Sequence, residues 1–207
     1  MTTTSYAVLG LLAIRPWTTY ELIQQVERTL RRMWPRAQSK LYEEPKKLVA
    51  LGFASASEEK VGNRPRTRYT ITDAGRAALA EWLTEPGAGP VLEFEQLLKI
   101  HLASSGTTDD IRANLDATRQ WVREQNEENL AAAQSYAAGE GEFPSRAALN
   151  LLIGRFLTDY YAMVDNWARW AAEVVREWPD DPGAAPLDAD ALAETARIAS
   201  ATQQGAR

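Results

Sequence analysis

The chain has 207 residues, with 23 Lys and Arg against 28 Asp and Glu, one His and no Cys. This length suits one or two domains with a sizeable core, and the lack of Cys excludes disulfides and Cys-bound metals. No apolar run approaches the roughly 18–20 residues of a membrane span, and the N-terminus lacks the pattern of a signal peptide. We therefore expect a cytoplasmic protein without a membrane partner.

Positive charge is concentrated in the N-terminal part. Residues 1–83 hold 13 Lys and Arg and 8 Asp and Glu, a net charge of +5, although the whole chain carries −5. Such an imbalance indicates that one part of the chain meets an anion and the other does not. The alternative is that small domains differ by a few charges for no functional reason, and the order of the predicted elements favours the first interpretation.

The N-terminal part begins with three predicted helices. The apolar run over residues 6–14 suits a buried helix. Thr18 and Glu21 have the spacing of a capping box, which begins a second helix. A third helix is predicted over residues 39–51, and Gly52 suits the left-handed turn that follows a helix.

Two short strands and a fourth helix follow. Residues 53–58 and 66–72 are rich in β-prone residues, and Gly62, Asn63 and Pro65 in the loop between them favour a hairpin. Thr72 and Asp73 can cap a fourth helix that ends near residues 82–83. The order of these elements predicts a winged helix-turn-helix.

Short motifs in this region also match a known family in their order and spacing. They are Tyr6-Ala-Val-Leu-Gly-Leu-Leu12, Thr19-Tyr-Glu-Leu22, Trp34, Leu41-Tyr42, Lys46-Lys-Leu48, Leu51-Gly-Phe53, Tyr69-Thr-Ile-Thr-Asp-Ala-Gly75-Arg76 and Trp82-Leu83. Over about its first 83 residues the chain resembles the PadR-like transcriptional regulators. The resemblance implies a protein that most often represses transcription at a promoter until an effector releases it. One departure is Pro45, because the family more often places Pro directly after the residue at Tyr42.

The predicted DNA-binding residues come from three places. In a helix-turn-helix the N-terminal part of the third helix faces the base edges of the major groove. Tyr42 and Lys46 are one helical turn apart and could both contact phosphates. The backbone N–H groups at the start of the second helix also attract a phosphate. A basic wing tip can reach the minor groove or the flanking phosphates. The candidates are Thr18, Tyr20, Gln38, Ser39, Lys40, Tyr42, Lys46, Lys47, Lys60, Arg64 and Arg66, with Glu43 and Arg68 as neighbours. Each alone would be interpreted as a solvated surface residue, and only the group favours DNA.

Residues 84–90 contain four Pro and Gly and predict a linker. We expect residues 91–179 to form a helical dimerisation domain, with helices over 91–103, 108–138 and 145–178, and residues 180–207 to form a tail. Within the tail, residues 180–187 suit a flexible spacer and residues 188–201 a short helix.

The strongest periodic pattern lies on the last long helix. Eight apolar residues are spaced by 4, 3, 4, 3, 4, 3 and 4 positions, which is a heptad seam on a rod of roughly 50 Å. The seam consists of Leu149, Ile153, Phe156, Tyr160, Met163, Trp167, Trp170 and Val174. The preceding helix can cover one side of such a rod, and a second subunit is the economical cover for the rest. Packing within one chain is the alternative.

Aromatic residues on and near the seam suggest an effector pocket. Trp121, Phe156, Tyr160, Trp167 and Trp170 could stack on a planar apolar ligand, and the resemblance includes relatives that bind aromatic acids or planar drugs. The alternative interpretation is that these side chains belong to the core or to the dimer interface.

The predicted fold is therefore mainly α with a small β-wing, an N-terminal winged helix-turn-helix followed by a C-terminal α-helical dimerisation domain. The predicted function is a homodimeric transcriptional regulator that binds a palindromic double-stranded DNA operator and responds to a planar aromatic effector, with no cofactor and no metal. Two alternatives are a winged-helix module that binds an acidic protein and a small enzyme or ligand carrier. The enzyme has little support, because His101 is the only His and no nucleophile or nucleotide-binding motif accompanies it.

Overall fold

The computed structural model describes residues 1–35, 41–61 and 64–205. The chain divides into two compact units, Met1–Pro90 and Val91–Arg207. Both are mostly helical, and within the described residues no helix is long and apolar enough to cross a membrane.

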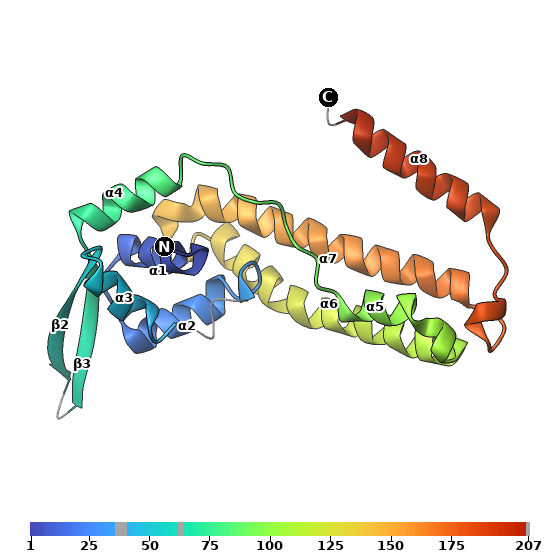
Figure 1. Ribbon diagram of the computed structural model, residues 1–207, viewed down its shortest axis with the longest axis horizontal. Helices are drawn as coiled ribbons and strands as arrows, with labels where there is room; N and C mark the ends of the chain where they lie inside the picture. Colours follow the sequence, from blue (N-terminus) through green and yellow to red (C-terminus); the bar gives the residue numbers. More distant parts are fainter. Residues whose placement is uncertain (36–40, 62–63, 206–207) are drawn as a thin grey trace. The chain divides into compact units, whose positions relative to one another are not determined.

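The N-terminal unit is a winged helix-turn-helix, which confirms the predicted fold. Its elements are α1 (Thr3–Ile14), β1 (Trp17–Thr18), α2 (Thr19–Thr29), α3 (Glu44–Ala50), β2 (Ala54–Val61), β3 (Arg64–Ile71) and α4 (Asp73–Trp82). The three strands form one antiparallel sheet in the order β1-β3-β2. The hairpin of β2 and β3 projects beside the helices α1–α3 (Figure 1). The short strand β1 is an element that the sequence patterns did not predict.

The core of this unit comes from the predicted apolar run of α1. Leu9 and Leu12 are almost completely buried, together with Leu22 and Val26 of α2 and Leu48 of α3. The rings of Tyr6 on α1 and Trp82 on α4 stack with centroids 4.7 Å apart. Packing of these large side chains holds the helices of this unit in a fixed arrangement.

The third helix is shorter than predicted. Its described part begins at Glu44, whereas residues 41–43 form a turn. Pro45 lies in the first turn of α3, where its missing N–H breaks no helical hydrogen bond, so a helix start here avoids the cost of an interior proline. The helix ends as expected at Gly52, which has a φ of 75°. The predicted residues Gln38, Ser39 and Lys40 lie outside the described residues.

The wing is longer than predicted. The ladder of β2 and β3 continues to the pairs Lys60–Pro65 and Val61–Arg64, so residues assigned to the loop because of the turn residues Gly62, Asn63 and Pro65 belong to strands. Backbone pairing satisfies N–H and C=O groups whatever the side chains are, and solvent-facing strand positions accept charged residues.

The C-terminal unit consists of α5 (Glu95–His101), α6 (Thr108–Ala137), α7 (Ala147–Val175) and α8 (Ala189–Gly205), with single 3₁₀ turns at Ala103–Ser105, Pro144–Arg146 and Pro182–Ala184. Helices α6 and α7 run antiparallel along each other, and α5 lies against the start of α6 (Figure 1). The two long helices are close to their predicted ranges. The helix predicted from residue 91 begins only at Glu95.

The start of the tail, which was predicted to be a flexible spacer over residues 180–187, contacts the first turn of α6. The backbone N–H of Thr108 donates to the Asp180 carbonyl at 2.9 Å, and the Thr108 hydroxyl donates to the Pro179 carbonyl. The Gly183 N–H donates to the Asp181 carboxylate at 2.8 Å. The first N–H groups of a helix have no partner within it, and the chain leaving α7 supplies one for α6.

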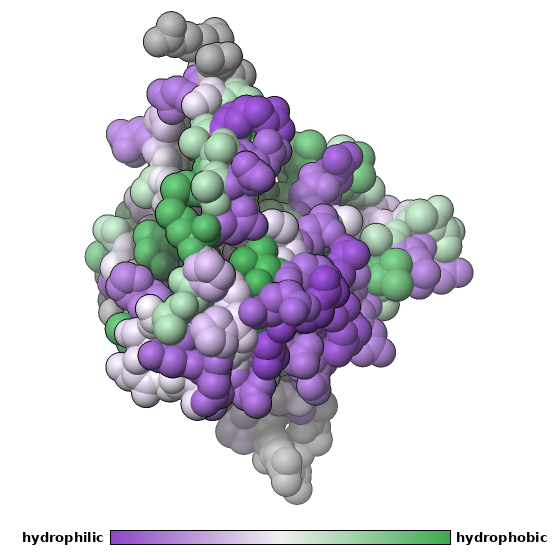
Figure 2. Space-filling view, turned by 90° about the vertical axis from the view of Figure 1, so that its right-hand side faces the viewer, coloured by the Kyte–Doolittle hydropathy of each residue, from purple (hydrophilic) through white to green (hydrophobic). Residues whose placement is uncertain are grey.

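Helix α7 carries two apolar stripes. The first packs on α6 and consists of Leu157, Tyr161, Val164, Ala168, Ala171 and Val175. The second is the predicted heptad seam: five of its residues are largely exposed, namely Leu149 (53%), Ile153 (40%), Phe156 (64%), Met163 (55%) and Trp170 (50%). Figure 2, which views the end of this unit where α7 finishes, shows hydrophobic surface between hydrophilic groups. Most of the seam therefore lies outside the α6–α7 contact, although Tyr160 and Trp167 are half-buried and pack against its core.

Candidate nucleic-acid interface

Two tyrosines extend from the helix-turn-helix into solvent. Tyr20 at the start of α2 is 66% exposed, and Tyr42 just before α3 is 64% exposed. Gln24 donates to the Tyr20 hydroxyl at 2.9 Å, which orients that ring. Thr18, which the sequence analysis grouped with Tyr20, is buried, and its hydroxyl accepts the Glu21 N–H. The exposed phenol groups are free to meet a partner, whereas the Thr18 hydroxyl is occupied in the helix cap.

The two lysines of α3 have different surroundings. Lys46 is exposed and pairs with Glu43 one turn earlier at 3.2 Å. Lys47 lies 3.5 Å from the buried carboxylate of Glu44 and 3.4 Å from the hydroxyl of Ser5 on α1. The Lys47 ammonium is thus directed toward α1, and it partly neutralises a carboxylate that is shielded from water.

The wing arginines also divide into two kinds. Arg66 is exposed, and among the described residues no carboxylate pairs with it. Arg68 donates from Nε to Glu59 at 2.6 Å, and this bond raises the pKa of its guanidinium. Lys60 and Arg64 occupy ladder positions next to the tip of the wing. Arg66 is therefore the described wing arginine that has its charge available for a phosphate.

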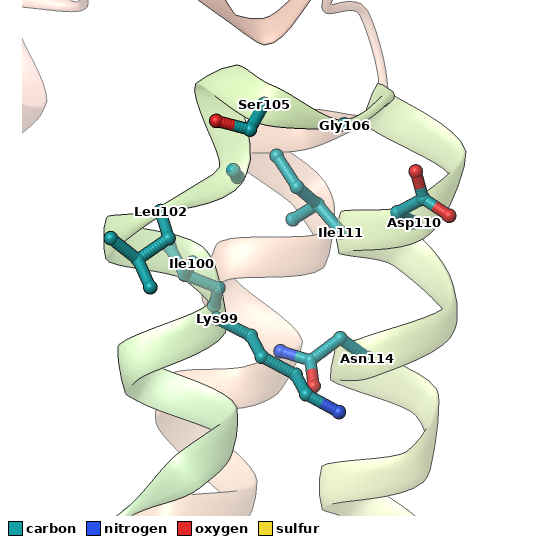
Figure 3. Close-up of a pocket in the computed structure, with 9 residues that line it drawn as sticks. Lys99, Ile100, Leu102, Ser105, Gly106, Asp110, Ile111 and Asn114 are labelled. Carbon is teal, nitrogen blue, oxygen red and sulfur yellow. The ribbon is translucent and has the colours of Figure 1, made fainter.

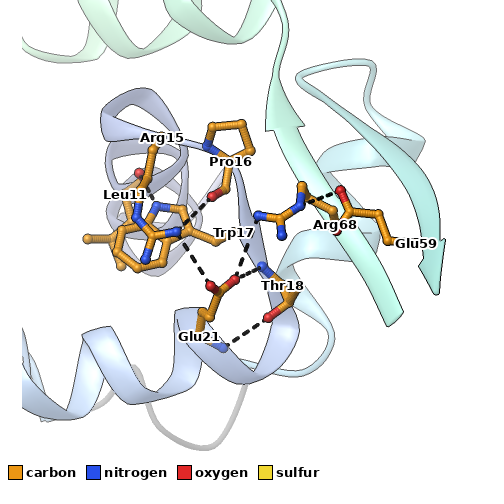
Figure 4. Close-up of polar contacts among 8 residues, drawn as sticks. All are labelled: Leu11, Arg15, Pro16, Trp17, Thr18, Glu21, Glu59 and Arg68. Atoms are coloured by element: carbon orange, nitrogen blue, oxygen red, sulfur yellow. Dashed lines mark hydrogen bonds and ion pairs between the residues drawn. The ribbon is translucent and has the colours of Figure 1, made fainter. Parts of the chain in front are cut away.

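Glu21 joins the helix start to the wing (Figure 4). Partial burial tends to raise the pKa of its carboxyl, but the hydrogen bonds from Thr18 and the charges of Arg15 and Arg68 outweigh this and the pKa lies below its usual value. The sequence predicted the capping contact of Glu21 from its spacing. It did not predict the contact with Arg68, which depends on the pairing of β1 with β3.

The five residues predicted to bind an effector do not enclose one cavity. Trp121 packs edge-on against Tyr161 with ring centroids 6.0 Å apart, and Tyr160 lies beside the same ring. Phe156 is exposed on the seam. Trp167 and Trp170 share a hollow of about 410 Å³, which they line with Ala191, Glu194, Thr195 and Ile198 of α8.

A second hollow, of about 270 Å³, lies between α5, the following turn and α6 (Figure 3). Ile100, Leu102 and Ile111 form its apolar part. Its polar groups are occupied within the protein: Lys99 pairs with Glu95, Asn114 donates to the Gln96 carbonyl, and Asp110 caps α6. This hollow therefore offers a ligand little directed polar contact.

Nothing in the described part of the chain is arranged as a metal site, since no three His, Asp or Glu side chains there are grouped to hold an ion. His101 is exposed at the last residue of α5.

Residues 8–81 match the Transcriptional regulator PadR-like family, and residues 95–176 match the Virulence activator alpha C-term family. The Negative transcriptional regulator PadR of Bacillus subtilis (strain 168) is 31% identical over 101 residues, which is 48% of this chain and 56% of that protein. The matched part thus spans only about half the length of that relative.

Two solved structures share the fold. Bacillus subtilis PadR in complex with operator DNA superimposes with a TM-score of 0.73 at 20% identity, over 84% of this chain and 99% of that one. The same protein in complex with p-coumaric acid superimposes with a TM-score of 0.67 at 20% identity, over 85% and 100%. The winged helix-turn-helix, residues 8–81, is thus the part of the chain that matches the PadR-like family of transcriptional regulators.

Proposed function

We propose that this protein is a homodimeric transcriptional regulator that binds a specific double-stranded DNA operator and represses until an effector releases it. The observation that carries the proposal is the exposed aromatic and cationic surface of α2, α3 and the wing on a winged helix-turn-helix of this family. The proposal assigns the chain no enzymatic activity and places it in the cytoplasm.

The proposed DNA surface has a centre and an edge. Tyr20, Tyr42 and Lys46 form its described centre, since all three side chains are exposed, Tyr20 in the first turn of α2 and the other two at the start of α3. Arg66, with Lys60 and Arg64 nearer the tip, forms the wing edge that meets phosphates or the minor groove. Gln38, Ser39 and Lys40 precede α3 and remain proposed for base contacts, since the N-terminal part of the third helix faces the major groove in this motif.

The exposed seam of α7 supports a homodimer. Its spacing reads the same in both directions, so a second α7 laid antiparallel brings every seam residue opposite another. This pairing sets Trp170 and Tyr160 against smaller side chains and brings Phe156 and Trp167 together as a ring pair, and it is two-fold symmetric, like the palindromic operator that we propose. The facing pairs are Leu149 with Val174, Ile153 with Trp170, Phe156 with Trp167 and Tyr160 with Met163.

The hollow beside Trp167 and Trp170 is the proposed effector site. It combines two indole rings with a polar group at Glu194, and a planar aromatic compound fits such a lining. A related PadR structure holds p-coumaric acid, which has this chemistry. Trp170 also belongs to the dimer seam, so a ligand that contacts it would bind the DNA-competent and the DNA-incompetent arrangements of the dimer with different affinities. Regulation by an effector requires such a difference in affinity.

The test is operator selection followed by a salt titration. Fragments of the source genome should be retained in preference to random DNA, with an affinity that falls steeply with salt. Lys46→Gln should reduce the slope of log affinity against log salt by about 0.9 without changing the preferred sequence. Lys99→Gln is the matched control, an exposed lysine in a similar ion pair on α5, and should leave the slope unchanged.

The alternative function gives a different result. A winged-helix module for an acidic protein would show no preference between genomic and random fragments, and Lys46→Gln and Lys99→Gln would affect its weak DNA binding alike. Either finding with a folded protein would exclude the operator-binding surface that we propose.

A further inference from the structure

Arg68 lies between two carboxylates that come from different parts of the winged unit. Its Nε donates to Glu59 of β2 at 2.6 Å, and its terminal nitrogen lies 3.9 Å from Glu21 of α2 (Figure 4). Its side chain is only 30% exposed. The guanidinium of Arg68 therefore links the outer strand of the wing to the first turn of the helix-turn-helix.

On the far side of Glu21 the contacts continue into the core. The Arg15 guanidinium is 3.5 Å from the Glu21 carboxylate and lies 3.4 Å from the ring centroid of Trp17. The buried Trp17 indole donates to the Leu11 carbonyl of α1 at 2.7 Å. The carboxylate that holds Arg68 is thus itself held by the end of α1 and by β1.

Within the described residues few other groups join the wing to α2 itself, although β3 also packs on α1 and β2 on α3. Strand β1 contributes only the pairs Trp17–Tyr69 and Thr18–Arg68, and a two-stranded hairpin has little stability of its own in water. Arg68 is one of the two β3 residues in this short ladder, so its side chain contacts act at the base of the wing.

Arg66 provides a comparison on the same strand. Side chains two residues apart share a face of a strand, so Arg66 and Arg68 face the same way. Glu59 is directly opposite Arg66 in the ladder, yet its carboxylate bonds Arg68. One arginine is bound to carboxylates, while its neighbour is exposed.

We propose that Arg68 is a positioning residue: it holds the wing against α2 through Glu59 and Glu21 rather than binding DNA, and both carboxylates are needed for operator affinity although they carry the same charge sign as DNA. This inference rests on the proposed function. The wing arginines then have two roles. Arg66 contacts phosphate, and Arg68 sets the orientation of the wing in which that contact is made.

The sign of the effect of Glu59→Gln tests the inference. If Arg68 bound phosphate, removing the competing carboxylate would free the guanidinium, remove a repulsion and tighten binding. As a positioning residue, Arg68 needs Glu59, so Glu59→Gln should weaken operator binding by about three- to tenfold, as expected for a charge-assisted hydrogen bond at a partly exposed site. Glu58→Gln is the matched control on the same strand and should not weaken it.

The salt slope and the double variant separate the two arginines. Arg66→Gln should reduce the slope by about 0.9. Arg68→Gln should weaken binding with the slope unchanged, and Arg68→Gln combined with Glu59→Gln should bind no more weakly than Arg68→Gln alone. A slope that falls by about 0.9 for Arg68→Gln, or tighter binding by Glu59→Gln, would overturn the inference.

Hydrogen exchange in the free protein gives a readout that does not need DNA. Arg68→Gln should accelerate exchange of the backbone amides in the β1–β3 ladder, and Arg66→Gln should not. If Arg68→Gln does not fold, Arg68→Lys is used instead. Lack of DNA binding by the parent protein would overturn the proposed function and this inference together. A parent that binds normally, with an unchanged ladder in Arg68→Gln, would overturn this inference alone.

Discussion

The most direct test of the dimer is a substitution at the centre of the exposed seam. Met163 is 55% exposed in the single chain. Complete burial of a Met side chain stabilises by about 1.5–3 kcal/mol, so covering the exposed half contributes about 1–1.5 kcal/mol. A symmetric dimer contains two copies, and the loss on Met163→Ala is therefore about 2–3 kcal/mol. This corresponds to a dissociation constant that is weaker by about 30- to 140-fold.

Met163→Glu should have a larger effect, because it brings an unpaired carboxylate into the interface at a cost of several kcal/mol more. Leu151→Glu is the matched control, since Leu151 is 69% exposed on the same helix but lies on neither apolar stripe. Sedimentation at micromolar concentration should show a dimer for the parent and for Leu151→Glu, and a monomer for Met163→Glu. Operator affinity should fall with dimer loss, because linked half-sites bind more tightly than one.

A parent protein that sediments as a monomer at micromolar concentration would refute this reasoning. So would a Met163→Glu variant that remains a dimer as tight as the parent.

Three further predictions concern the fold and its regulation. Gly75→Ala should destabilise the winged unit by about 1–3 kcal/mol in thermal unfolding, because a Cβ there would lie 2.1 Å from the Phe53 carbonyl oxygen. Gly10 has open space around it, so Gly10→Ala should instead stabilise α1 by about 0.5–1 kcal/mol. The folded-state pKa of Glu21 is lowered from 4.5, so the ionised carboxylate stabilises the fold above about pH 4.5 and this stabilisation is lost on further acidification. Below that pH the unfolding free energy should therefore fall less steeply in Glu21→Gln than in the parent, as denaturant titrations at each pH can check. An aromatic acid that releases the operator should quench Trp fluorescence, and Trp170→Ala should remove the quench; a release that persists without any quench in the parent would place the effector elsewhere.

The sequence by itself determined the features that depend on local spacing. Thr18 and Glu21 specify the start of α2 because a capping box needs only the residues of one turn. The apolar run of α1 and the period of α7 likewise predicted helices and the faces that are apolar. The order of these local elements was enough to predict a winged helix-turn-helix.

Only the tertiary structure decided which groups meet across elements. The heptad period of α7 could not reveal that the neighbouring stripe packs on α6 and leaves the seam exposed, because both stripes are apolar and share one helix. The charges of Lys47 and Arg68 resembled those of Lys46 and Arg66 in the sequence. In the folded protein Lys47 lies beside Glu44 and Ser5, and Arg68 lies beside Glu59 and Glu21. Lys46 and Arg66 make none of these contacts, and a charge acts mainly through the groups that lie within a few ångströms of it.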